Sequence, residues 1–172
     1  PGAVVQPVVT QADRLLRADE LKAAVERHVL RTAAHCTAGA PAALVTSGKV
    51  FYEVVVESIG SSCCIGWATQ EFAAADAVQE DLGKQADSWC LNVSNGKLRH
   101  KRIERHSKAQ QARPKLMEPY ADGDVIGMAI DFGKGELWMA RNDEWYVAFV
   151  VDPAVLVATG GLFPTFEGTG VV

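Results

Sequence analysis

From residue 48 onward the sequence consists of short apolar runs separated by clusters of Gly, Asn and Asp. The runs are rich in Val, Ile, Phe and Trp, which is typical of β-strands bounded by turns. No long amphipathic segment lies between them to serve as a crossover helix, so the pattern predicts an antiparallel sandwich instead of alternating β–α units. The predicted strands cover residues 49–58, 63–68, 88–93, 97–100, 124–131, 135–140, 145–151 and 162–166.

Three turn signals join neighbouring runs. Asn95-Gly96 tolerates the positive φ angles of a tight hairpin turn. Asn142-Asp143 can adopt left-handed backbone geometry without a glycine, and the segment 131–135 supplies a third reversal. Three successive reversals between apolar arms predict a meandering antiparallel sheet.

The first 47 residues favour no single structure. Residues 19–27 combine good helix formers with an acidic first turn behind a potential Asp19 cap. Lys22 interrupts the apolar stripe of such a helix, and the apolar residues also fit a period of two, so helix and strand both remain open for residues 19–31.

A turn at Gly39-Ala40-Pro41 divides the chain. We expect an N-terminal lead-in segment, residues 1–43, packed on a main sandwich domain, residues 44–172. A chain of 172 residues has room for one such domain and buries enough surface to need no disulfide or metal.

The net charge and the cysteine spacing exclude some classes of function. The net charge of −4 gives no reason to expect nucleic acid as the main partner, and no apolar run is long enough to insert into a membrane. The four cysteines lack the C-x-x-C spacing of metal sites, which indicates reduced, mostly buried thiols and favours an intracellular, cytoplasmic location.

Two segments carry opposite charge. Residues 69–88 are acidic and residues 101–115 are basic. Each is interpreted either as a solvated loop or as a binding patch.

No residue pattern indicates catalysis. The four histidines have no metal-ligand spacing, and no G-x-S-x-G motif offers a nucleophile. The sequence therefore predicts no enzyme activity, no metal and no cofactor.

Short motifs follow one another along residues 44–170. The first motifs are Gly48-Lys49-Val50-Phe51-Tyr52-Glu53-Val54, Ile65-Gly66-Trp67-Ala68, Asp87-Ser88-Trp89, Ser94-Asn95-Gly96-Lys97 and Gly123-Asp124-Val125-Ile126-Gly127. The remaining ones are Asp131 with Gly135, Asn142, Val147-Ala148-Phe149 and Leu162-Phe163-Pro164. The order and spacing of these motifs resemble the SPRY domain, an interaction module of ubiquitin-ligase adaptors, tripartite-motif proteins and ryanodine receptors.

The resemblance implies an all-β, concanavalin-like jelly-roll sandwich. We expect large motif side chains to face between the sheets, and Glu53, within an apolar strand, to need a structural hydrogen-bond partner if it is buried. The motif residues assigned structural roles are Tyr52, Glu53, Gly66, Trp67, Trp89, Gly123, Asp124, Asp131, Phe149 and Pro164. The family's final strand normally runs further, so we also expect the C-terminal strand to be truncated.

By the resemblance, the chain is a non-catalytic module that binds a partner protein or peptide through inter-strand loops. The loop residues expected to bind are Glu71, Phe72, Tyr120, Trp145, Glu167, Gly168 and Thr169. Phe72 is the most attractive anchor, since buried aromatics dominate interface energies, and the alternative is that it folds back onto the sandwich.

Two other functions remain open. The domain could be docked permanently in a large assembly as a structural part. It could also bind glycans, because lectins use similar sandwiches and a fold does not determine a function.

Overall fold

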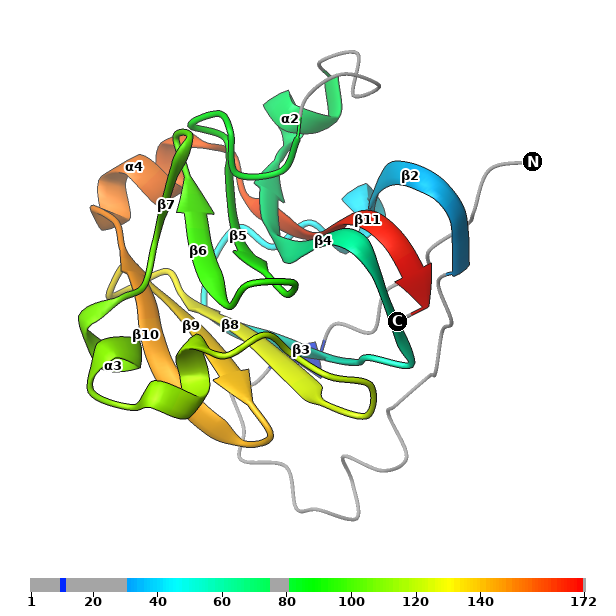
Figure 1. Ribbon diagram of the computed structural model, residues 1–172. Helices are drawn as coiled ribbons and strands as arrows, with labels where there is room; N and C mark the ends of the chain where they lie inside the picture. Colours follow the sequence, from blue (N-terminus) through cyan, green and yellow to red (C-terminus); the bar gives the residue numbers. More distant parts are fainter. Residues whose placement is uncertain (1–9, 12–30, 75–80, 172) are drawn as a thin grey trace.

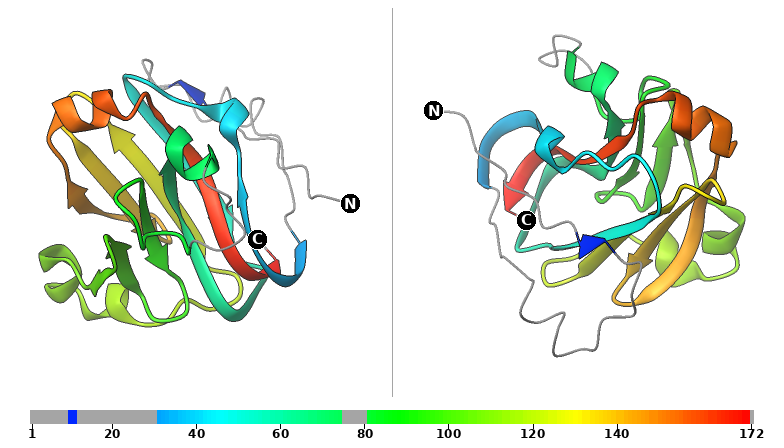
Figure 2. Two further views of the ribbon diagram at one scale, coloured as in Figure 1. Left: turned by 90° about the horizontal axis from the view of Figure 1, so that it is seen from above. Right: turned by 180° about the vertical axis from the view of Figure 1, so that it is seen from behind.

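A computed structural model describes residues 10–11, 31–74 and 81–171, which form two antiparallel sheets packed face to face (Figures 1 and 2). Sheet A has the order β1 (Thr10–Gln11), β3 (Lys49–Val55), β8 (Val125–Asp131), β9 (Glu136–Arg141) and β10 (Glu144–Val150). Sheet B has the order β2 (Arg31–Gly39), β11 (Leu162–Val171), β4 (Ser58–Thr69), β5 (Ser88–Asn92), β6 (Lys97–His100) and β7 (Ile103–Arg105). The all-β sandwich expected from the sequence is therefore confirmed.

Short helices connect several strands. α2 follows β4 at the top of Figure 1, and α3 and the 3₁₀ helix η2 lie between β7 and β8. The helical segments are η1 (Pro41–Ala43), α2 (Gln70–Ala74), α3 (Lys108–Gln111), η2 (Pro114–Met117) and α4 (Pro153–Ala158).

The β9–β10 turn has the expected left-handed residues, whereas the β5–β6 turn has four residues between Asn92 and Lys97, and of its Asn95-Gly96 pair only the glycine has a positive φ. Asn142 and Asp143 have φ of 51° and 68°, and Gly96 has φ of 69°. These left-handed values suit the twist of the flanking strands, which is why Asn, Asp and Gly occupy such turns.

The main core lies between the sheets. Trp67, Trp89 and Phe149 are buried there, and the half-buried Tyr52 packs edge-on against Trp67 with ring centroids 5.0 Å apart. Gly66 allows close strand approach, since a Cβ there would lie 2.0 Å from the Trp89 carbonyl oxygen. These large side chains therefore fill the space between the two sheets.

Glu53 departs from the expectation of a buried carboxylate. Tyr52 and Val54 turn toward the core, and the alternation of a strand therefore turns Glu53 outward, where it is exposed. It needs no buried partner.

The lead-in segment is described only in part. β2 begins at Arg31 and pairs with β11, so residues 31–39 belong to sheet B. The choice between helix and strand for 19–31 otherwise falls outside the described residues. β11 lies between β2 and β4 and pairs with both.

Candidate functional site

Two of the predicted binding residues, Glu71 and Phe72, lie in α2. Glu71 is exposed, but the Phe72 side chain is only 3% exposed. It packs in a second, smaller core on the outer side of sheet B, with Leu82 and Phe163. The structure thus shows the alternative interpretation of Phe72, in which the ring folds back onto the sandwich.

Glu167 and Gly168 lie within strand β11 and not in a loop. Glu167 is 1% exposed, and its carboxylate accepts a hydrogen bond from the Leu82 N–H. Gly168 is also buried. The side chain of Thr169 lies outside the described residues.

Tyr120 and Trp145 lie near each other at the end of sheet A that carries the β9–β10 turn. Tyr120 is buried beneath the Arg141 guanidinium, whose carbon is 4.5 Å from the ring centroid. Trp145, in β10, is half-buried. The structure therefore divides the predicted residues between two places, and among those described only Glu71 and Trp145 keep accessible side chains.

The outer face of sheet A carries a row of partly exposed apolar side chains that follows the strand registers. Four strands, β3, β8, β9 and β10, place Phe51, Ala129, Trp138 and Val147 in one row across the sheet. Their neighbours in the chain turn inward to the core. We call this row, together with Trp145 and Val150, the platform.

Trp145 extends the platform by one row. A Cβ on Gly127 would lie 2.6 Å from the Trp145 indole, so the ring lies over Gly127 and Ala140. Val150, at the opposite end of β10, is 75% exposed. The small residues beneath the indole leave room for the ring to lie against the sheet.

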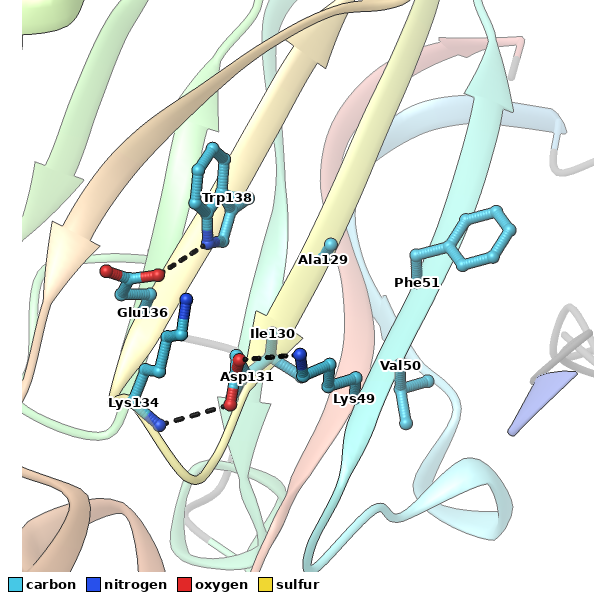
Figure 3. A pocket seen from close by; sticks show the side chains of 9 residues that line it. All are labelled: Lys49, Val50, Phe51, Ala129, Ile130, Asp131, Lys134, Glu136 and Trp138. Carbon is cyan, nitrogen blue, oxygen red and sulfur yellow. Dashed lines mark hydrogen bonds and ion pairs between the residues drawn. The ribbon is translucent and has the colours of Figure 1, made fainter. Parts of the chain in front are cut away.

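A shallow hollow of about 240 Å³ borders the platform (Figure 3). Trp138, Ala129 and Phe51 line it from three neighbouring strands. The rim is charged, because Lys49 pairs with Asp131 at 3.4 Å and the Trp138 indole N–H donates to Glu136 at 3.1 Å. An apolar centre with a polar rim is the usual anatomy of a protein interface.

Glu53 lies at the edge of the platform opposite the hollow. Partial burial raises the pKa of this carboxyl, and the negative charge of Asp143 adds to the rise.

Sequence reasoning missed Phe51 and Trp138 as surface residues. Phe51 stands beside a core tyrosine, and Trp138 lies between two buried residues, Leu137 and Met139. The period of two was a usable signal, since it places both aromatics opposite their buried neighbours.

Asp124 organises the segment that carries Tyr120. Partial burial alone would raise its pKa, but hydrogen bonds from the Ala121 N–H (2.8 Å), Asn142 (2.7 Å) and Arg141 (2.7 Å), with the charge of Arg141, outweigh it and lower the pKa. The motif residues Asp124 and Asn142 therefore act structurally.

This lowered pKa gives a pH prediction. The contribution of Asp124 to stability is complete above the unfolded-state pKa near 3.9 and is lost as the pH falls through the folded-state value. We expect Asp124→Asn to lower the free energy of unfolding by about 1–2 kcal/mol at neutral pH and by less near pH 3. Urea unfolding at both pH values measures this, and a difference independent of pH would contradict it.

Cys63, Cys64 and Cys90 are free, buried thiols, with Cys63 in the main core and Cys64 in the second core. Among residues 10–11, 31–74 and 81–171, no three His, Cys, Asp or Glu side chains are grouped to hold a metal ion. The same residues contain no helix long and apolar enough to cross a membrane.

Comparisons with known proteins agree with this geometry. The model of the SPRY domain family matches residues 49–168. The crystal structure of the SPRY domain of human HERC1 superposes with a TM-score of 0.60 at 17% sequence identity, covering 81% of this chain and 77% of that one. The search of curated protein sequences found no significant match.

Proposed function

The chain belongs to the SPRY domain family, and from the family's general role as a protein-interaction module we propose that it binds a segment of a partner protein and catalyses no reaction. We place the contact on the platform of sheet A. The observation that carries this proposal is the row of partly exposed apolar side chains across four strands.

The composition of the platform supports this role. Interface energy is concentrated in a few aromatic side chains, which lose water when a partner covers them. Trp138 and Trp145 supply two such side chains, and Phe51 a third. The strands hold all three in fixed positions, so little conformational entropy is lost on binding.

The β9–β10 hairpin connects the proposal to the loop-binding expected from the sequence. Trp145 is the second residue of the strand that leaves this turn, and Arg113 donates to its carbonyl oxygen at 3.3 Å. The partner would therefore contact the hairpin end and the sheet face together.

The test compares proteins captured from a native extract by the unchanged chain and by two variants. Trp138→Ala removes the centre of the platform, and Val157→Ser removes an apolar side chain of α4 that is exposed and lies off the sheet. We expect a partner that is retained by Val157→Ser and depleted about 30-fold by Trp138→Ala, because truncating an interface tryptophan costs about 2 kcal/mol or more.

Circular dichroism and thermal unfolding establish that both variants are folded. If all three proteins capture the same set in equal amounts, the platform is not the binding surface. Retrieval of one large complex by all three would favour the alternative of a structural part docked by another face.

A further inference from the structure

The hairpin between β6 and β7 has an unusual turn. Its two central residues, Lys101 and Arg102, have φ of 51° and 63°. Left-handed backbone is strained for a side-chain-bearing residue, and Asn, Asp or Gly reduce that strain. The β9–β10 turn uses Asn142-Asp143 for the same geometry. A Lys-Arg pair is therefore energetically unfavourable at this turn.

The fold requires the turn's backbone and not its side chains. The Lys101 N–H donates to the Gln85 carbonyl at 3.3 Å, and the Arg102 N–H donates to the Gly83 carbonyl at 3.2 Å. Both side chains are exposed. Any residue suited to positive φ would keep these hydrogen bonds, so the hairpin geometry does not explain the two charges.

The surroundings of the turn are positive. Arg105 in β7 is exposed as well, and Glu104, the acidic residue of that strand, is paired with Arg99 at 2.6 Å. Burial lowers the pKa of His100, and the charges of Lys101 and Arg105 lower it further. A ligand that fits this edge carries negative charge.

β7 also offers backbone groups. It is the last strand of sheet B, and its three residues are exposed, with Ile103 at 59%. His100 and Ile103 close the two-residue turn. That pair exchanges hydrogen bonds, so the N–H and C=O of the next residue, Glu104, point away from β6 toward the open edge.

We propose that an extended, acidic segment of a protein docks along β7, pairs its backbone with Glu104, and sets its carboxylates against Lys101, Arg102 and Arg105. Addition of a strand to an open sheet edge is a known mode of peptide recognition. Ile103 supplies an apolar contact in the middle of the basic edge. The site lies on sheet B and is independent of the platform on sheet A.

The test uses a variant in which the strain of this turn is relieved. Lys101→Asn/Arg102→Gly puts the preferred residues into the turn and removes both charges. We expect the variant to raise Tm by about 2–4 °C, because the strain of two left-handed residues is relieved, and to bind an acidic peptide about tenfold more weakly. A purely structural role of the two residues would predict no loss of binding.

The probe is a short, fluorescently labelled peptide of alternating glutamate and valine, followed by fluorescence anisotropy. Three further ligands complete the experiment: a lysine–valine peptide, the acidic peptide with a methylated backbone, and oligothymidylate. We expect each to bind at least about tenfold more weakly than the acidic peptide, since they lack the charge, the backbone donors or the strand conformation. Lys115→Asn, which removes an exposed charge of η2, is the matched control and should bind normally.

Each opposite outcome overturns the proposal. Equal binding of oligothymidylate would show an unselective polyanion surface, and equal binding of the methylated peptide would exclude strand pairing. Unchanged affinity of Lys101→Asn/Arg102→Gly for the acidic peptide would exclude the turn from the binding site. None of these results depends on Trp138, so this proposal and the platform proposal fail separately.

Discussion

Replacing Arg141 by alanine will lower the free energy of unfolding by about 3 kcal/mol. One guanidinium nitrogen donates to the carbonyl oxygens of Lys115 (3.0 Å) and Glu118 (3.2 Å). The other donates to the Pro119 carbonyl (3.1 Å) and to the Asp124 carboxylate (2.7 Å). Four acceptors around a shielded side chain lose their donor together, and the carboxylate among them keeps its charge.

Arg141→Lys separates the charge from the geometry. A lysine keeps the positive charge but cannot reach four acceptors with a planar fork, so we expect it to recover less than half of the loss. Glu118→Ala is the control, because Arg141 contacts only the backbone carbonyl of that residue. Urea unfolding measures all three, and an Arg141→Ala variant within about 0.5 kcal/mol of the native chain would contradict the prediction.

Replacing Glu167 by alanine will have an effect of similar size, about 2–4 kcal/mol, concentrated on one loop. The buried carboxylate accepts from the Leu82 N–H. The Leu82 carbonyl in turn accepts from Arg99 and from the Cys90 thiol, both at 3.3 Å. Leu82 thereby attaches the segment 81–87 to sheet B, and because Leu82 is fully buried, bulk solvent does not reach its N–H to replace the lost acceptor.

Glu167→Gln is the conservative partner of this variant. The amide keeps an oxygen for the Leu82 N–H, so we expect at least half of the stability to return. Amide hydrogen exchange at Leu82 should accelerate strongly in Glu167→Ala and moderately in Glu167→Gln. If Glu167→Ala loses a binding partner without loss of stability, Glu167 is a contact residue as the sequence suggested and not an attachment point.

Local signals explain the success of the strand predictions. The run 97–100 coincides with β6, the run 124–131 begins one residue before β8, and the run 145–151 is shifted by one residue from β10. Their boundaries are set by residues such as Asn95, Gly96 and Asn142, whose turn preferences act within a few residues. The strand β7 and helix α4 were missed, because an exposed three-residue edge strand and a six-residue helix have no periodic apolar pattern.

The candidate site was harder to predict, because the burial of its residues depends on contacts between distant parts of the chain. Phe72 and Tyr120 are aromatics in non-strand segments, which is what a surface anchor also looks like in sequence. Phe72 is buried because Leu82 and Phe163, distant in the chain, meet it on sheet B. No pattern of neighbouring residues in the sequence predicts such a contact.

The sequence by itself determined the two-sheet architecture, its hairpins and its motif core, because strand alternation and turn preference are properties of a few neighbouring residues. Only the tertiary structure decided which aromatic side chains reach the surface. Alternation gives every strand two faces, and the packing of one sheet on the other decides which is covered. That packing buries Tyr146 and leaves Trp138 and Trp145 on the accessible face of sheet A.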